Sequence, residues 1–153
     1  MMPPRVFISI HNQRLRHYTK DDELLGEYQI STAEKGIGVR EGSYATPIGR
    51  FKIAEMIGDG AAPFTIFKGR KPIGQHDPKT PSSDDLITSR IVWLDGLQEM
   101  NANTKDRYIY IHGTNHESRI GKPCSLGCIR MLNSDIIKFF DELSPETLII
   151  INP

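Results

Sequence analysis

The chain lacks the features that mark several specialised protein classes. Only 2 of its 153 residues are cysteines, too few for the disulfide framework of a small secreted domain. No charge of either sign is in excess, because 19 basic residues balance 19 acidic ones. The lack of a basic surplus argues against a nucleic-acid partner and against a polybasic anchor on a membrane surface.

Long hydrophobic runs are also lacking. The longest ones, such as residues 148–151, are far too short to cross a bilayer, so no membrane span is expected. Residues 1–10 lack the longer apolar region and the small-residue cleavage site of a signal peptide. The sequence therefore leaves two compartments open: the cytoplasm, or the cell envelope if an export segment lies outside the given chain.

The chain does contain many short alternating or apolar segments, separated by glycine, proline and polar clusters. Seven or so short strands with frequent turns indicate a mainly β fold, either a β-sandwich or a barrel. The length fits one domain over residues 1–153, and no internal repeat is present. Strands are expected at residues 6–10, 28–30, 51–53, 64–67, 91–94, 108–111 and 147–151.

One prominent helix is predicted near the C-terminal end. Asn133 or Ser134 can cap its start, and Pro145 marks its end. Residues 69–85, rich in proline, glycine, serine and aspartate, are expected to form a long surface loop. Trp93 lies in an apolar run and is expected in the core. The buried stripe of the helix, at the spacing i, i+3, i+4, i+7, would consist of Ile136, Phe139, Phe140 and Leu143.

The segment that carries chemistry runs from residue 108 to residue 131. It reads Tyr-Ile-Tyr-Ile-His-Gly-Thr-Asn-His and, after a loop, Cys-Ser-Leu-Gly-Cys-Ile-Arg-Met. His112 falls at a predicted strand end, and Cys128 lies in a turn where Gly127 lets the backbone bend tightly. A free thiol titrates near ~8.5, so a thiolate at neutral pH needs help. Arg130, the dipole of the following helix, or a histidine acting as base or ion-pair partner could supply it.

This segment resembles the catalytic signature of the L,D-transpeptidase family, the YkuD-type catalytic domain. That signature is an Ile-His-Gly-Thr-like strand end, a loop, then Ser-x-Gly-Cys-Ile/Val-Arg-Met and a helix. Residues 44–51, Tyr-Ala-Thr-Pro-Ile-Gly-Arg-Phe, resemble the family's Thr-Pro-x-Gly-x-Phe turn. Residues 13–15, 85–96 and 147–151 are similar to other family segments, so the resemblance extends over most of the chain.

The resemblance implies a cysteine acyltransferase. Cys128 would be the nucleophile, His112 the general base, and the carbonyl of Gly113 the group that orients the imidazole. Backbone N–H groups around Gly127 and Cys128 would stabilise the oxyanion. The implied reaction, on a peptidoglycan tetrapeptide stem, forms a thioester, releases D-alanine and makes a 3→3 cross-link. Water, as in an L,D-carboxypeptidase, or a lipoprotein lysine would be the alternative acceptor.

The resemblance implies further properties. Carbapenem-type inhibitors would acylate the cysteine, no metal or organic cofactor would take part, and the protein would work in the periplasm or elsewhere in the bacterial envelope. Leu126 departs from the family, in which many members have histidine and some have lysine. This difference bears on substrate preference and rate.

Substrate contacts are also expected from residues beside the nucleophile. Arg130 either contacts a substrate carboxylate or pairs with an acid to hold the turn. Ser125 either donates a hydrogen bond to substrate or stabilises the turn. The expected contact residues are Thr114, Asn115, Ser125, Gly127 and Arg130.

Two other interpretations compete with the enzyme. His112-x3-His116 and Cys124-x3-Cys128 have spacings that zinc tolerates, and four ligands is the right number, so the segment could be a zinc-binding domain. A catalytically silent wall-binding protein with an enzyme-like fold is the other. Cys124 is otherwise expected to be structural, because a disulfide to Cys128 would close a tiny loop and consume the nucleophile.

Overall fold

The computed structural model describes residues 2–153, which contain ten strands, one α-helix and two short 3-10 helices. Every predicted strand has a counterpart, and the mainly β class is confirmed. In chain order the elements are β1 (Arg5–Ser9), β2 (Arg14–Tyr18), β3 (Leu24–Ser31), β4 (Gly49–Ile57), β5 (Thr65–Lys68), β6 (Lys71–Gln75), β7 (Ile87–Gly96), η1 (Glu99–Asn101), β8 (Tyr110–Thr114), η2 (Glu117–Arg119), β9 (Ile129–Met131), α1 (Asn133–Glu142) and β10 (Leu148–Asn152).

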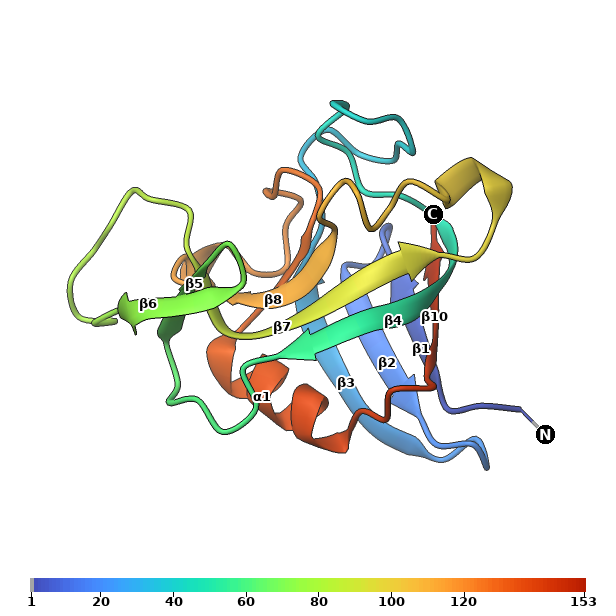
Figure 1. The fold of residues 1–153 in the computed structure, drawn as a ribbon, viewed down its shortest axis with the longest axis horizontal. Coiled ribbons are helices and arrows are strands. Elements are labelled where there is room, and N and C mark those ends of the chain that lie inside the picture. Colours follow the sequence, from blue (N-terminus) through green and yellow to red (C-terminus); the bar gives the residue numbers. More distant parts are fainter. Residues whose placement is uncertain (1) are drawn as a thin grey trace.

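The strands form one sheet that closes on itself. Their order is β4-β10-β1-β2-β3-β9-β8-β7-β5-β6, and β4 also pairs with β7. All ten strands except β5 and β6 therefore form a closed ring of eight, from which the β5–β6 hairpin projects (Figure 1). Within the ring, β1–β10 and β8–β9 are parallel and the other pairs are antiparallel. Of the two predicted architectures, the chain adopts the barrel.

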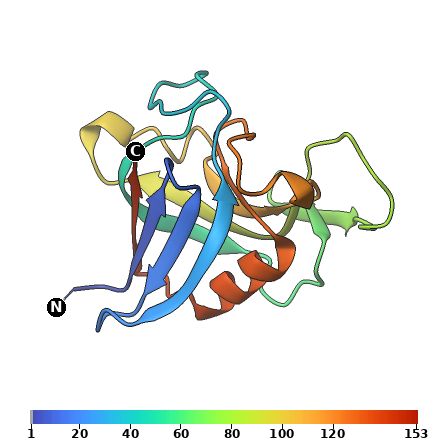
Figure 2. The ribbon, with the colours of Figure 1, turned by 180° about the vertical axis from the view of Figure 1, so that it is seen from behind.

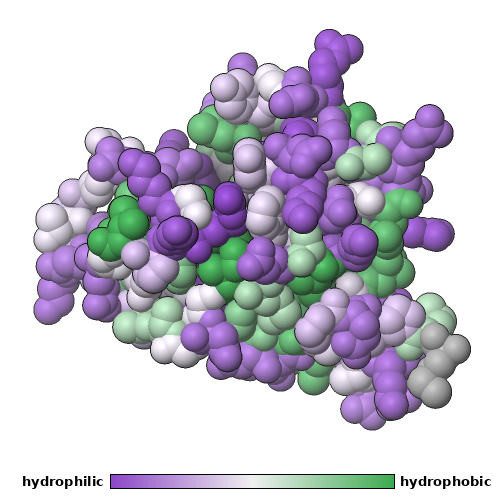
Figure 3. Space-filling model, in the orientation of Figure 1, coloured by the Kyte–Doolittle hydropathy of each residue, from purple (hydrophilic) through white to green (hydrophobic). Residues whose placement is uncertain are grey.

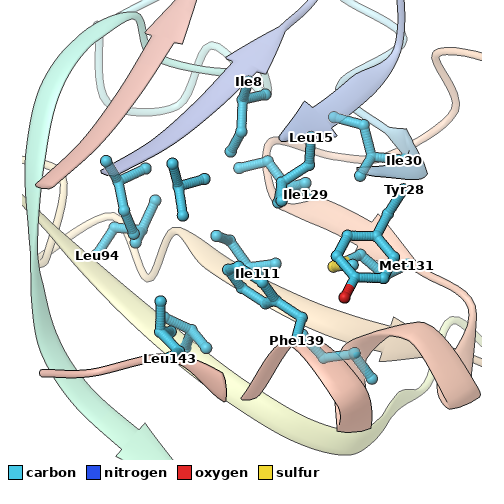
Figure 4. Packing of buried hydrophobic residues seen from close by; sticks show 14 of the residues in the cluster. Ile8, Leu15, Tyr28, Ile30, Leu94, Ile111, Ile129, Met131, Phe139 and Leu143 are labelled. Carbon is cyan, nitrogen blue, oxygen red and sulfur yellow. The ribbon is translucent and has the colours of Figure 1, made fainter. Parts of the chain in front are cut away.

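The interior of the ring is filled by branched and aromatic side chains (Figure 4). They come from alternate positions of each strand, as the two-residue period of a pleated strand requires. In Figure 2, α1 lies below the ring beside β3, and it contacts β3, β7 and β8. Labelled members that are fully buried include Ile8, Leu15, Ile30, Ile111, Ile129 and Phe139.

The helix has the predicted buried stripe, but its start differs from the prediction. Ile136, Phe139 and Phe140 are buried in the core. The residue at the N-cap is Leu132, and no side chain caps the helix there. The expectation that Asn133 or Ser134 caps the helix is therefore wrong, because the chain enters α1 directly from the short strand β9.

The segment expected to be a long surface loop contains a strand. β6 lies within residues 69–85, and all five of its residues are exposed, so no alternation of apolar and polar residues reveals it. Its hairpin turn places Gly69 and Arg70 in the left-handed region, with φ of +55° and +64°. Trp93 is buried as predicted, but in a second cluster outside the ring with Phe67 and Tyr110.

The surface has no large continuous hydrophobic area on the face shown in Figure 3, where apolar side chains form small patches among hydrophilic ones. The largest exposed apolar side chains include Tyr44, Tyr108 and Leu126, which together line a cavity of about 290 Å³. Leu126, the position that departs from the family signature, thus lies in solvent contact within the Ser-x-Gly-Cys turn.

Across residues 2–153, no helix is long and apolar enough to span a membrane.

Candidate active site

Strands β8 and β9 bring His112 and Cys128 to one face of the sheet. The two strands pair in parallel, with His112 opposite Arg130. Their isoleucine residues point into the barrel core, so His112 and Arg130 point outward. Cys128, two positions before Arg130, packs against the outer cluster that contains Tyr110. The two predicted catalytic side chains therefore lie at neighbouring positions on the outside of the barrel.

The Cys128 sulfur is held between the backbones of two tyrosines. The N–H of Tyr110 donates to Sγ at 3.3 Å, and the thiol donates to the carbonyl of Tyr108 at 3.4 Å. Gly127 precedes the cysteine with a φ of +129°, a left-handed conformation that favours glycine. A Cβ at this position would lie 3.3 Å from the carbonyl oxygen of Ala45, so the turn is also closely packed.

The hydroxyl of Ser125 stabilises this turn. It donates to the carbonyl of Cys128 at 2.6 Å and accepts from the N–H of Gly127 at 3.2 Å, and the residue is buried. Thr46 donates to the carbonyl of Gly127 at 3.0 Å from the other side. The structure therefore favours the turn-stabilising interpretation of Ser125 over a substrate contact. The Ser125 hydroxyl also accepts the N–H of Gly127, which is one of the groups expected to stabilise an oxyanion.

The His112 ring is held in one orientation by the next residue. Nδ1 lies 2.5 Å from the carbonyl oxygen of Gly113, and a carbonyl can only accept, so Nδ1 carries the proton. Nε2 is then left with the lone pair that a general base needs. Gly113 has no room for a side chain, because a Cβ would lie 2.5 Å from the carbonyl oxygen of Thr88.

Asn133 fixes the end of β8 beside this histidine. Its Nδ2 donates to the carbonyl of Thr114 at 2.7 Å, and its Oδ1 accepts from the hydroxyls of Thr88 and Ser89 at 2.5 Å each. The side chain is buried and joins β7, β8 and the start of α1. Its position suggested only a helix cap, so sequence reasoning missed this role.

Two expected substrate contacts are used within the protein. The Thr114 hydroxyl is fully buried and accepts from the N–H of His116 at 3.0 Å, so a substrate contact through it is excluded here. Asn115 accepts from the N–H of Leu86 at 3.0 Å and donates to the carbonyl of Asp84 at 2.9 Å. It ties the segment before β7 to the end of β8.

Arg130 adopts the second of its two expected roles. Nη2 lies 2.7 Å from a carboxylate oxygen of Asp85, and Nη1 donates to the sulfur of Cys124 at 3.5 Å. The arginine is buried, and sequence reasoning did not identify its acidic partner. The pairing with an acid is therefore the arrangement in this structure, rather than a guanidinium open to a substrate carboxylate.

Burial keeps both candidate catalytic groups neutral. It lowers the pKa of His112 to about 4, although the hydrogen bond with Gly113 acts in the opposite direction. Burial likewise raises the pKa of the Cys128 thiol to about 11, against the effect of the Tyr110 N–H. At neutral pH the site therefore holds a thiol and a neutral imidazole rather than a thiolate–imidazolium pair.

The helix that follows the candidate nucleophile carries a counter-charge at its start. Strand β9 lies between Cys128 and α1 in the chain. The carboxylate of Glu117 accepts the N–H of Asn133 at 2.8 Å and occupies the positive end of that dipole. This carboxylate offsets the help that the helix dipole could give a thiolate.

The four residues of the zinc interpretation do not converge. Nδ1 of His112 faces the carbonyl of Gly113, and Nε2 of His116 lies 2.8 Å from the carbonyl oxygen of Ser82. Cys124 and Cys128 are free thiols. Nowhere in the described part of the chain do three or more residues of the metal-binding types lie together. The structure therefore gives the zinc interpretation no ligand set.

The chain is similar to known proteins over nearly its whole length. The family model described as L,D-transpeptidase catalytic domain, YkuD, matches residues 3–151. The Bacillus licheniformis protein YkuD is 26% identical over 152 residues, covering 99% of this chain and 67% of that protein. The Bacillus subtilis protein YqjB is 28% identical over 111 residues, covering 72% of this chain and 59% of that protein.

Solved structures share the fold. L,D-transpeptidase 3 of Mycobacterium tuberculosis, in complex with a faropenem-derived adduct, has a TM-score of 0.63 at 14% identity. The similarity covers 98% of this chain and 61% of that one. The chain thus spans 59% to 67% of the length of these three relatives.

Proposed function

The chain belongs to the L,D-transpeptidase catalytic domain family, and on this basis we propose that it is a cysteine acyltransferase acting on peptidoglycan tetrapeptide stems. The observation that supports this activity most directly is the placement of Cys128 and His112 on one face of paired strands, with the imidazole held by Gly113 at 2.5 Å. As part of the same proposal, the protein acts in the periplasm or elsewhere in the cell envelope, where this substrate lies.

In the proposed first step, the sulfur of Cys128 attacks the carbonyl carbon of the third stem residue. Nε2 of His112 takes the thiol proton as the C–S bond forms. The imidazolium then gives that proton to the nitrogen of D-alanine as the C–N bond breaks. A neutral thiol and a neutral imidazole on one face of the sheet suit this step, because the base starts with its lone pair free and the nucleophile brings its own proton.

In the second step, an amine of another stem attacks the thioester. His112 accepts a proton from the amine and returns it to the sulfur as the C–S bond breaks, which leaves a 3→3 cross-link. The same acyl-enzyme would serve a water molecule, giving an L,D-carboxypeptidase, or a lipoprotein lysine. The backbone N–H of Cys128 would stabilise the oxyanion in both steps, since that of Gly127 already donates to Ser125.

Two experiments test the proposal. First, the protein is incubated with a carbapenem and its intact mass is measured. We expect one adduct on the parent and on Cys124→Ser, and none on Cys128→Ser. A protein of the same fold has been solved in complex with the carbapenem imipenem, which supports this choice of probe. An adduct on Cys128→Ser would show that Cys128 is not the nucleophile.

Second, the protein is incubated with a disaccharide-tetrapeptide and the products are identified by mass. A dimer that has lost D-alanine indicates transpeptidation, and a tripeptide indicates hydrolysis. No product together with no carbapenem adduct would contradict the proposed function and favour a silent wall-binding protein.

A further inference from the structure

Three aromatic side chains beside the candidate nucleophile form what we term the aromatic shelf: Trp93, Tyr108 and Tyr110. Trp93 stacks on Tyr108 with ring centroids 5.8 Å apart and an interplanar angle of 27°. Tyr110 packs edge-on against Trp93 at 5.7 Å. The backbones of the two tyrosines are the groups that hold the Cys128 sulfur, so the shelf is directly attached to the reaction site.

The guanidinium of Arg70 lies on this shelf. Its central carbon is 4.6 Å from the centroid of the Trp93 ring and 5.4 Å from that of Tyr108. Its Nη1 donates to the hydroxyl of Tyr110 at 3.2 Å. Stacking on aromatic faces together with a hydrogen bond holds the planar group in one place. The guanidinium therefore loses little conformational entropy when it binds a ligand.

Arg70 reaches the shelf from the turn of the projecting β5–β6 hairpin. Lys68 pairs with Lys71 across this turn, and Gly69 and Arg70 form its two central residues. Arg70 has a φ of +64°, where glycine or asparagine is the usual residue. An arginine in this strained position, with its side chain against the nucleophile's neighbours, indicates a role beyond forming the turn.

Arg70 keeps hydrogen-bonding capacity for a ligand. None of the four ion pairs found among residues 2–153 includes it, and its bond to Tyr110 uses one N–H group. It lines a cavity of about 490 Å³ together with Tyr110, Ile91 and Asp85. Asp85 is paired with Arg130, which offsets the negative charge on this wall. A guanidinium fork with free N–H groups matches a carboxylate.

We propose that Arg70 is a specificity-determining residue that binds a carboxylate of the donor stem peptide while Cys128 attacks the adjacent carbonyl. The proposal rests on the proposed function, since it names the group by which the same site recognises its donor. Two carboxylates of a tetrapeptide stem have this chemistry: the terminal one on the leaving D-alanine, and the one on the side chain of the diamino acid. The experiment distinguishes them.

The test compares Arg70→Gln and Arg70→Lys with a matched control, Lys71→Gln, on the same turn. Each protein is assayed with three donors: the free tetrapeptide stem, the stem amidated at its C-terminus, and the stem amidated at the diamino acid side chain. KM and kcat are determined separately for each combination of protein and donor. Carbapenem adduct formation on Cys128 reports, independently of these donors, whether the nucleophile is intact.

We expect Arg70→Gln to raise the KM for the free stem about 10- to 100-fold, the effect of losing a charge-assisted hydrogen-bonded pair. Arg70→Lys should recover part of this affinity, and Lys71→Gln should match the parent. In the parent, amidating the contacted carboxylate should produce a similar rise, to which Arg70→Gln adds little. Amidating the other carboxylate should leave the effect of Arg70→Gln on KM unchanged. The comparison thus identifies which of the two carboxylates Arg70 binds.

An equal loss for Arg70→Gln on all three donors would overturn the proposal, because Arg70 would then only hold the hairpin against the shelf. An unchanged KM in Arg70→Gln, with an active parent, would overturn it as well. A parent that turns over no donor and forms no adduct would instead refute the proposed function, so the two failures are distinguishable.

Discussion

The guanidinium of Arg130 lies 2.7 Å from the carboxylate of Asp85, which joins the strand after the catalytic turn to the segment before β7. The arginine side chain is 5% exposed and the aspartate side chain 42% exposed. Both charges act on His112 and on Cys128, in opposite directions. The pair therefore places a buried cation near the candidate catalytic residues, together with a carboxylate that acts on their pKa values in the opposite direction.

Removal of the acid should leave that cation buried without a counter-charge. We expect Asp85→Asn to lower the free energy of unfolding by about 1–3 kcal/mol, less than for a fully buried pair because Asp85 is partly exposed. Urea denaturation at neutral pH measures the loss. Asp84→Asn, at the exposed neighbouring position, is the control and should stay within about 0.5 kcal/mol of the parent. A similar loss in both variants would contradict a specific role for the pair.

The fold was largely predictable because its strands alternate between core and surface. The alternation of apolar residues in β1 and β3 and the stripe of α1 correspond to buried faces, and the apolar run of β7 is buried on both of its faces. β6 was missed because none of its residues is buried. The choice of a barrel over a sandwich depends on the pairing of β4 with β7, which no local pattern encodes.

The residues of the candidate site that lie in one sequence segment could be predicted, but their contacts with distant segments could not. Cys128, His112 and the Gly113 carbonyl follow from a motif within one segment of the chain, and the structure puts Cys128 and His112 on the same face of the sheet. Asp85 and Arg70 act across 45 and 40 positions, respectively, so only the folded chain identifies their partners. The neutral state of the thiol was also missed, since desolvation depends on burial and not on neighbouring residues in sequence.

The protonation state of Cys128 can be measured in Cys124→Ser, which leaves one cysteine in the chain. We expect its alkylation by iodoacetamide to rise with pH up to about 11, because burial raises the pKa of this thiol. The adduct is followed by intact mass over time. In Cys128→Ser, the remaining thiol of Cys124 provides the comparison. A plateau of the Cys124→Ser rate below pH ~8.5, the ordinary range of a free thiol, would indicate a resting thiolate.

The pKa of His112 makes a prediction about stability at acid pH. The unfolded chain binds a proton on this residue near pH 6.5, and the folded chain only near pH 4. The unfolded state therefore binds more protons as the pH falls through this window, so folding stability is lost between 6.5 and 4. The expected loss is about 3 kcal/mol.

Urea denaturation across this window, compared with His112→Gln, isolates the contribution of the histidine. The variant cannot bind the proton, so its stability should decline less steeply with falling pH, whatever its stability at neutral pH. Identical slopes in the parent and the variant would show that His112 titrates alike in both states.

Asn133 provides the last prediction, because its amide can be tested against the capping role that its position suggests. Its side chain satisfies the buried hydroxyls of Thr88 and Ser89 and the carbonyl of Thr114. Asn133→Ala would leave these groups without a partner, at a cost of about 2–4 kcal/mol. It should also slow acylation of Cys128 by a carbapenem, because the end of β8 carries the Gly113 carbonyl that orients His112.

Ser134 is the matched control, since it is exposed and occupies the next position of the same helix start. Ser134→Ala should change the free energy of unfolding by less than about 0.5 kcal/mol and leave acylation unaffected. Urea denaturation and the time course of the carbapenem adduct measure the two effects. If both variants lost similar stability and acylated at the parent rate, the residues would act only on the helix start. A loss of stability and of acylation rate confined to Asn133→Ala would instead mean that this amide maintains the orientation of His112, the proposed general base.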